Sequence, residues 1–207
     1  MNDRSPGVAM LSEADRGNRA AIINAALVAF GAEGFNGASM RDIASGAGTG
    51  LSNLYNYFPS KSHLLAELLQ RANDELLNRT SAAVREAGDG PAERLREAVK
   101  AYVGFVVDHQ TAALVAISEM RYLRGEVRQQ VVRARDSTQA IFGEIIDEGV
   151  AAGEFTTPHP RGAARGIVSM CSAISTWYDE QGELSKQDLA EQHARYALAL
   201  LETPFED

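Results

Sequence analysis

The chain has 207 residues, of which 45% are hydrophobic and 23% are charged, as is typical of a globular protein with one or two domains. No apolar run approaches the ~20 residues of a membrane span, and the N-terminus lacks a secretory signal, so we expect a cytoplasmic protein without a membrane partner. Cys171 is the single cysteine, which excludes an internal disulfide. Residues 1–61 carry five basic and five acidic side chains, so the net charge of −8 arises from residues 62–207.

Apolar side chains recur at helical spacing along the chain, with almost no strand-like alternation, which predicts an all-α fold of nine helices. Residues 1–16 are expected to form a mobile arm. The expected helices span about 19–33, 39–47, 51–58, 60–87, 92–108, 111–123, 126–152, 161–180 and 186–202.

The helices expected over 39–47 and 51–58 are too short to be stable alone, and the glycine-rich segment 46–50 joins them. Ser39 and Asp42 have the spacing of a capping box with Asp in place of Glu, and so have Ser185 and Asp188. Two short helices with a tight turn, braced by a third, indicate a helix-turn-helix unit. The alternative, a phosphate-binding loop, needs a preceding strand and a following Lys-Ser/Thr pair, which this segment lacks.

The segment LYNYFPSK, residues 54–61, divides into an apolar and a polar face. Leu54 and Phe58 share the face that packs on the other two helices. Small polar groups, amides and phenols occupy the rest of the surface: Ser52, Asn53, Tyr55, Asn56 and Tyr57. Asn can pair with adenine in the major groove, and tyrosine hydroxyls can reach phosphates. The alternative is an ordinary surface helix whose tyrosines pack on neighbours.

Lys61 is expected at the first position of the next helix, where the positive end of the helix dipole disfavours a cation. A bound anion such as a DNA phosphate would offset that cost. Arg41 is a candidate for a second phosphate contact, and Arg16 or Arg19 for a third. Each is by itself a common surface charge, and together they favour binding to DNA.

Residues 19–65, RAAIINAALVAFGAEGFNGASMRDIASGAGTGLSNLYNYFPSKSHLL, closely resemble the N-terminal domain of TetR-family transcriptional regulators. The resemblance implies a dimer with a helix-turn-helix DNA-binding domain over residues 17–61 and an effector-binding and dimerisation domain over 62–207. It also implies a ligand-responsive regulator, expected to be a repressor of a palindromic operator. The DNA contacts carried over from the family are Arg41, Leu51, Ser52, Asn53, Tyr55, Tyr57 and Lys61.

Two positions depart from the usual family pattern. Gly50 lacks the usual hydroxyl for capping the recognition helix, and Thr49 is a candidate to supply it. Leu51 replaces a common polar side chain, so it either contacts a thymine methyl group or joins the stripe of Leu54. The operator sequence therefore does not follow from the resemblance.

The helix expected over 161–180 has no polar face until its end. An apolar stripe of Ile167, Cys171, Ile174 and Tyr178 lies beside a stripe of small residues, so the helix is expected to be covered on all sides. A partner subunit would provide the extra cover, and a purely intrachain core helix is the alternative. The expected dimer interface, which includes the helix over 186–202, comprises Gly166, Met170, Ala173, Trp177, Tyr196 and Leu200.

Residues 92–152 combine apolar rows with several arginines, which predicts a cavity with apolar walls and a cationic rim. The segments SEMRYLR, EGVAAGEF and WYDEQGELS resemble family members that respond to acyl thioesters. That weaker resemblance implies a small-molecule effector with a long apolar part and an anionic end, such as an acyl-CoA. The expected ligand-binding residues are Tyr102, Val106, Ile117, Arg121 and Ile141.

No pattern in the chain indicates catalysis. The four histidines lie on separate elements without metal-ligand spacing, and no nucleophile motif is present. We therefore expect no catalytic residues, no metal site and no cofactor. An all-α enzyme and a helical adaptor that does not bind DNA are the alternatives to a DNA-binding regulator.

Overall fold

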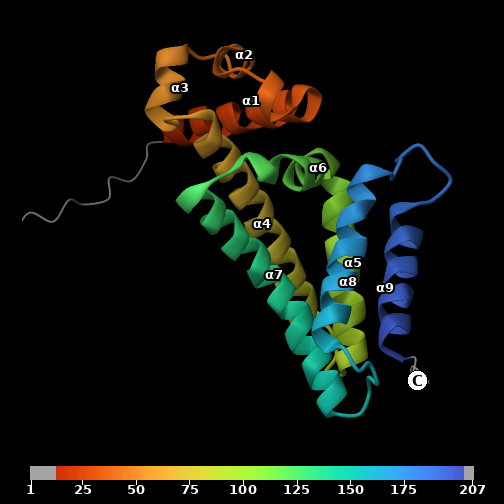
Figure 1. Ribbon diagram of the computed structural model, residues 1–207. Helices are drawn as coiled ribbons and strands as arrows, with labels where there is room; N and C mark the ends of the chain where they lie inside the picture. The colour runs from red at the N-terminus through yellow and green to blue at the C-terminus, as the bar shows by residue number, and fades with distance from the viewer. Residues whose placement is uncertain (1–12, 203–207) are drawn as a thin grey trace, which may run out of the picture.

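The computed structural model describes residues 13–202, and helices joined by turns and loops make up this part of the chain (Figure 1). The prediction of nine helices is confirmed for these residues. Of the arm expected over 1–16, residues 1–12 lie outside the described residues, and residues 13–16 form the start of the first helix. The α-helices are α1 (Glu13–Gly37), α2 (Met40–Gly46), α3 (Leu51–Tyr57), α4 (Lys61–Glu86), α5 (Pro91–Asp108), α6 (Gln110–Glu119), α7 (Gly125–Ala151), α8 (Pro160–Ala173) and α9 (Lys186–Glu202).

Local capping interactions explain several helix boundaries. The Ser39 hydroxyl accepts a hydrogen bond from the Asp42 backbone N–H at 3.1 Å, and Ser185 accepts one from Asp188 at the same distance, as predicted. Ser60 caps α4 by accepting from the backbone N–H of His63 at 3.3 Å. These side chains satisfy N–H groups that a helix start leaves without a partner.

The helix expected over 161–180 is shorter than predicted, because α8 ends at Ala173 and the chain continues as a 3-10 turn, η2 (Ile174–Thr176). The hydroxyls of Ser175 and Thr176 donate to backbone carbonyls three residues earlier, at 3.0 and 2.7 Å. Such bonds compete with regular helix geometry. Helix α6 likewise continues as a 3-10 turn, η1 (Met120–Tyr122).

The buried side chains form two cores, and α4 contributes to both. The first core joins α1, α2, α3 and the start of α4, up to Leu69, and it also contains Val115, Leu123 and Val131 from later in the chain. The second core contains Leu76 of α4 and side chains of α5, α7, α8 and α9. The division between the cores therefore lies within α4, beyond the domain boundary expected at residue 61.

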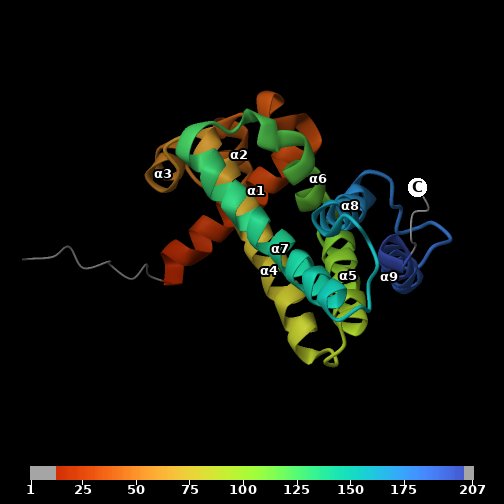
Figure 2. The ribbon, with the colours of Figure 1, turned by 60° about the horizontal axis from the view of Figure 1, so that its bottom comes forward.

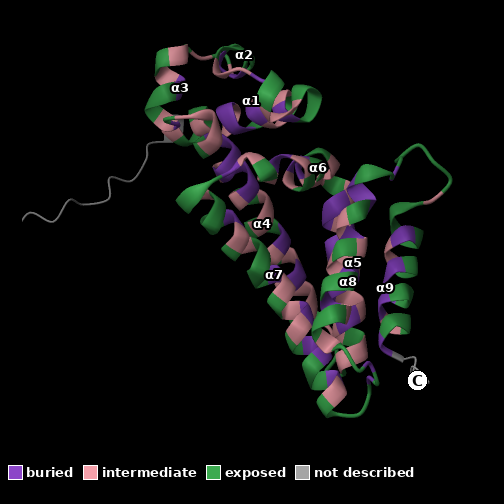
Figure 3. Cartoon of the chain, viewed as in Figure 1, coloured by how far each residue is buried: buried purple, intermediate pink, exposed green. Residues whose placement is uncertain are grey.

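The two cores lie at opposite ends of the molecule. Helices α1, α2 and α3 form one end, and α6 lies between α1 and the remaining helices (Figures 1 and 2). Helices α4 and α7 lie side by side, and α9 packs mainly on α5. Exposed and buried residues alternate along α9 (Figure 3).

One helix of the described residues is long and apolar enough by composition to cross a membrane, contrary to the sequence expectation that no such run exists. It is α1 between Asp15 and Gly37, and the bent pair of α5 and α6 also passes when taken together. The α1 side chains Ile22, Ala26 and Phe30 are buried in the first core. Apolar residues are favoured both in a core helix of a globular protein and in a membrane span, because both remove apolar surface from water.

Candidate DNA-binding surface and internal cavity

The turn between α2 and α3 depends on a left-handed glycine. Gly48 has φ +66°, a conformation that costs a glycine little and other residues more. The chain reverses there with the Thr49 N–H donating to the Ala44 carbonyl at 3.0 Å. Helix α3 is thereby set at an angle to α2, in the arrangement expected of a helix-turn-helix unit.

Helix α3 presents a polar surface, as its sequence predicts. Leu54 and Phe58 are buried and hold the helix against α1 and α2. Ser52 is exposed, and Tyr55 is 48% exposed. Leu51 is half-buried at the edge of the first core, which corresponds to the second of the two expectations for it.

The expected cap by Thr49 is wrong, because Gly50 occupies the N-cap position of α3 and no side chain caps the helix. The Thr49 hydroxyl instead accepts a hydrogen bond from the Asn53 side-chain amide at 2.8 Å. The amide group of Asn53 keeps its carbonyl oxygen and a second N–H. Asn53 is half-buried and is held in place by Thr49.

The candidate phosphate-binding cations differ in their surroundings. Arg41 on α2 and Arg16 on α1 are exposed. Arg19 forms an ion pair with Glu67 at 3.0 Å and lies 4.9 Å above the Phe58 ring, so it joins α1 to α4. Of the two arginines considered for a third phosphate contact, Arg16 is the more accessible.

Lys61 already has partners within the protein. Its ammonium donates to the backbone carbonyl of Ala38 at 2.7 Å and lies 4.6 Å from the centre of the Phe35 ring. A carbonyl oxygen and the face of an aromatic ring both attract a cation. These contacts offset the unfavourable helix dipole without any bound anion, which the sequence argument had not considered.

The two tyrosines of α3 also differ. The Tyr57 hydroxyl donates to Asp15 at 2.9 Å and so connects α3 to the start of α1. The Tyr55 ring is the more exposed of the two. Tyr55 is therefore the more accessible phenol on the surface that α3 presents.

A cavity of about 510 Å³ lies among α4, α5, α6, α7 and α8. Tyr102, Val106 and Ile117 line it, as predicted. Arg121 and Ile141 do not, since Arg121 is exposed beside Tyr122 and Ile141 packs against the second core. Arg135, one of the arginines expected at the cationic rim, does line the cavity. The polar lining residues that were not predicted are Asn73, Gln139, Arg165, Ser169, Ser172 and Thr176.

The sequence spacing of the polar lining residues places them on common helix faces, which can be recognised once the packing is known. Arg135 and Gln139 are four residues apart on α7, and Arg165, Ser169 and Ser172 follow helical spacing on α8. Each set therefore lies on one helical face. Spacing alone does not show which of the several such faces turns toward the cavity.

The cavity wall is mainly apolar, with a few directed polar groups. The Tyr102 hydroxyl lies 2.7 Å from the Ser172 hydroxyl, which donates to the Val168 carbonyl at 2.8 Å, so Tyr102 is the donor of that pair. Burial raises the pKa of Tyr102 to about 12, so this donor stays protonated. Arg135 and Arg165 are exposed cations at the edge of the cavity. This lining suits a ligand with an apolar body and an anionic end.

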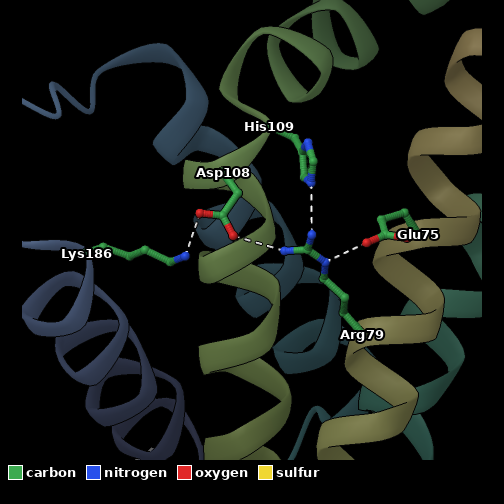
Figure 4. Close-up of polar contacts among 5 residues, drawn as sticks. All are labelled: Glu75, Arg79, Asp108, His109 and Lys186. Atoms are coloured by element: carbon green, nitrogen blue, oxygen red, sulfur yellow. Dashed lines mark hydrogen bonds and ion pairs between the residues drawn. The ribbon is translucent and has the colours of Figure 1, made fainter.

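A polar network beside the cavity joins α4, α5 and α9 (Figure 4). The Arg79 guanidinium contacts Glu75 at 2.8 Å, Asp108 at 3.0 Å and the ring nitrogen Nε2 of His109 at 3.0 Å. Lys186 at the start of α9 binds the second oxygen of Asp108. Because a guanidinium only donates, Nε2 of His109 accepts and its Nδ1 carries the proton.

The network shifts the pKa values of its charged groups. The Lys186 ammonium, and then Arg79, lower the pKa of Asp108 by hydrogen bonding to its charged form. The pKa of Arg79 is raised, mainly by its hydrogen bond to Glu75. Cys171, by contrast, is buried in the second core, and burial raises its thiol pKa to about 12.

The segment that follows α8 and η2 exposes an apolar side chain beside those of α9, and we call this the α8–α9 surface. Trp177, Tyr196 and Leu200 are 54%, 53% and 51% exposed. Of the other residues expected at a dimer interface, Gly166 and Ala173 are exposed and Met170 is half-buried, and Ala173 also lines the cavity. The apolar stripe predicted over 161–180 is buried, although its last two residues lie in and after η2: Ile167, Cys171, Ile174 and Tyr178.

Within residues 13–202 no group of three or more His, Cys, Asp or Glu side chains has a geometry that could hold a metal ion. The histidines have structural contacts instead. His63 contacts the Ser60 hydroxyl at 2.8 Å, and the buried His193 contacts the Leu189 carbonyl at 2.9 Å.

Two family models match the chain. Residues 22–68 match the model for bacterial regulatory proteins of the tetR family, and residues 88–201 match the model for the tetracyclin repressor-like C-terminal domain. The HTH-type transcriptional activator FasR of Mycolicibacterium smegmatis is 30% identical over 183 residues, which cover 86% of this chain and 80% of FasR. The HTH-type transcriptional repressor KstR2 of Mycobacterium tuberculosis is 25% identical over 87% of this chain and 90% of KstR2.

Solved structures share the fold. A regulatory protein of the tetR family from Rhodococcus RHA1 superposes with a TM-score of 0.85 at 26% identity, over 94% of this chain and 100% of that one. AibR, solved in complex with isovaleryl coenzyme A and operator DNA, superposes with a TM-score of 0.78. Its identity is 22% over 91% of this chain and 100% of AibR, so this second likeness concerns the fold alone.

Proposed function

The chain belongs to the TetR family of bacterial DNA-binding transcriptional regulators and is not an enzyme, and from this premise we propose that it represses transcription from a palindromic operator. It binds this operator as a homodimer in the cytoplasm, where the bacterial chromosome lies. An acyl-CoA that occupies the internal cavity releases the protein from DNA.

The surface of α3 is the observation that carries the DNA-binding part of the proposal. Two buried anchors fix the helix, while its outer face offers a hydroxyl, amides and a half-exposed phenol. Side chains of this size and chemistry fit the major groove and can pair with base edges. Arg41 is placed on the preceding helix, where a phosphate contact would set the register.

The exposed apolar side chains of α8 and α9 support the dimer. Trp177, Tyr196 and Leu200 are each about half exposed, and a second subunit would remove them from water. A two-fold dimer places two recognition helices on successive grooves, about 34–36 Å or a multiple of that distance apart. The operator is accordingly expected to be an inverted repeat.

The cavity supports the effector class. Its apolar walls suit an acyl chain, and Arg135 and Arg165 at its edge suit the phosphates of coenzyme A. AibR, which has the same fold, was solved with isovaleryl coenzyme A and operator DNA. We transfer the ligand class, and not the acyl chain length, to this protein.

Selection of genomic DNA by the purified protein, followed by mobility shifts at 50–200 mM salt, tests the DNA-binding part. We expect an inverted repeat to be enriched, and its affinity to fall steeply with salt as phosphate contacts release counterions. Equal affinity for scrambled duplexes would contradict operator recognition.

An acyl-CoA series of increasing chain length, titrated into the operator complex, tests the effector. We expect release of DNA together with a rise in the melting temperature of the free protein, because a ligand that binds the folded state stabilises it. Free coenzyme A is the control. Release without a change in melting would indicate competition at the DNA surface, and no release at tens of micromolar would remove acyl-CoA as the effector.

A further inference from the structure

Helix α6 separates the cavity from the DNA-binding end of the molecule. On one side, Ala113, Ala116 and Ile117 line the cavity, and Met120 follows at the start of η1. On the other side α6 packs against α1. A Cβ atom at Gly31 of α1 would lie 2.6 Å from the Thr111 methyl group, so α1 and α6 are in close contact there and a larger residue would require the Thr111 side chain to move.

Glu119, the last residue of α6, is a buried carboxylate with a specific partner in α1. Its side chain is at the boundary of the first core and the residue is 7% exposed. Its Oε2 atom accepts a hydrogen bond from the backbone N–H of Phe35 at 2.7 Å. A hydrogen bond from an amide to a buried carboxylate is stronger than one between neutral groups.

The Phe35 amide is located at a sharp bend in α1. Gly34 has φ +67° and ψ +174°, a region of backbone conformation that is essentially restricted to glycine. The bend directs the chain toward Ser39 and α2. The Glu119 carboxylate thus holds the point from which the helix-turn-helix unit extends.

The Phe35 ring adds further contacts at the same place. It stacks on the Tyr122 ring with centroids 5.3 Å apart, and the Lys61 ammonium lies 4.6 Å above it. Lys61 in turn binds the Ala38 carbonyl just before α2. The bend in α1 is therefore held by Glu119 and Tyr122, which lie next to the cavity-lining residues of α6 and η1, and by Lys61 at the start of α4.

We infer that Glu119 is a positioning residue that couples occupancy of the cavity to the orientation of the helix-turn-helix unit. A molecule in the cavity displaces α6, and the bond between Glu119 and Phe35 carries this displacement to the bend in α1 and on to α2 and α3. The inference rests on the proposed function, since it concerns how the same cavity controls operator binding. A competing route exists through α4, which lines the cavity with Ala72 and Asn73 and begins at the DNA-binding end.

A double-mutant cycle separates the two routes without knowledge of the effector. Val168→Trp places bulk in the cavity from α8. Binding of the selected operator duplex is measured for the wild type, Val168→Trp, Glu119→Ala and the double variant. Coupling between sites is typically 5–150-fold, so we expect Val168→Trp to weaken operator binding about tenfold in the wild type. In the Glu119→Ala background we expect a change of less than about twofold.

Glu119→Gln is the matched control, because its amide oxygen can still accept the Phe35 N–H while the charge is removed. It should restore the tenfold effect of Val168→Trp. If Glu119→Ala does not fold, Glu119→Asp removes one methylene and withdraws the carboxylate from Phe35. Thr176→Phe fills the cavity if Val168→Trp does not fold.

An equal effect of the filling variant in the wild-type and Glu119→Ala backgrounds would assign transmission to α4 and overturn the inference. An unchanged operator affinity after filling the cavity would overturn it as well. A wild-type protein that selects no operator would instead contradict the proposed function, and the inference with it.

Discussion

We propose that individual side chains on α2 and α3 have separable roles in reading DNA. Asn53 is held by Thr49 and keeps hydrogen-bonding groups for a base, whereas Arg41 is an exposed cation suited to a phosphate. A base contact contributes specificity and a phosphate contact contributes affinity. This difference leads to a test with two distinct outcomes.

Asn53→Ala should relax preference at one or two operator positions by about 1–3 kcal/mol, because it removes a pairing group for one base edge. Arg41→Ala should weaken binding to all operator variants alike and reduce the slope of log affinity against log salt by about one. Anisotropy titrations over a panel of single-base operator variants measure both effects. Arg71→Ala on α4, whose partner is Glu67, is the control and should change neither.

Lys61 combines a structural contact with a candidate phosphate contact. Lys61→Ala removes the bond to the Ala38 carbonyl and the contact with the Phe35 ring, so it should lower stability by about 1 kcal/mol. It should also weaken operator binding. Thermal unfolding and DNA titrations on the same sample check the two effects. A loss of affinity without any loss of stability would show that the contact with Ala38 contributes nothing in solution.

At the scale of helices, the network around Arg79 joins three elements at the edge of the second core (Figure 4). It connects α4 with the end of α5 and the start of α9. The Arg79 guanidinium also lies 5.8 Å from the centre of the Phe105 ring, which lines the cavity. The network therefore holds the cavity-lining helices α4 and α5 together.

Asp108→Asn should destabilise the protein at neutral pH by about 0.5–1 kcal/mol, a value for solvent-exposed ion pairs. Lys186 is the main cause of the lowered pKa of Asp108 in the folded state. The charged Asp108 carboxylate therefore stabilises the folded state fully at pH values above its unfolded pKa of about 4. That contribution is lost as the pH falls through the folded pKa. Urea unfolding from pH 7 to pH 3 should show the variant and the wild type converging at the acidic end, and a constant difference would contradict this assignment.

Most helix positions followed closely from local pattern, but α1 spans Glu13–Gly37 instead of the expected 19–33. The N-termini of α2, α4 and α9 agree with the predicted boundaries. Each capping serine lies three residues before the backbone N–H that it accepts from, so the signal is local in sequence. The end of α8 was predicted too late, since the hydroxyls of Ser175 and Thr176 bend the chain away from a regular helix. That competition is also local, but helical periodicity does not reveal it.

At the scale of the whole molecule, the α8–α9 surface is the part of the chain that a second copy would cover. Leu200→Asp should shift the dimer toward monomer by at least about tenfold in dissociation constant, because it would place a charge in an apolar contact. Val28→Asp on α1 is the control, since Val28 is 70% exposed and lies outside this surface. Sedimentation at micromolar concentration measures the change.

Gly166→Leu tests the same surface with a change of size. A Cβ atom at Gly166 would meet nothing within 4 Å in the subunit, so we expect the loss of dimer to arise from crowding between subunits. A monomeric wild type at micromolar concentration would contradict the proposed interface.

The family, the helix-turn-helix unit and the polar surface of α3 could be predicted from the chain, because they depend on residues close together in sequence. The partners of the cations could not. Lys61 binds the carbonyl of Ala38 and Arg19 pairs with Glu67, in both cases across more than twenty residues. Such contacts depend on how the helices are rotated about their axes.

The same reason explains the cavity and the coupling residue. Arg121 and Arg135 have similar sequence surroundings, and only the packing of α7 against α4 and α8 brings Arg135 to the cavity. Glu119 resembles any polar residue at a helix end, yet the packing of α6 on α1 places its carboxylate 2.7 Å from the Phe35 amide. Periodicity and capping determine where helices form, because they act over one or two helical turns and can be recognised in the sequence. Contacts between helices involve residues far apart in the chain, so only the tertiary structure decides which of them form.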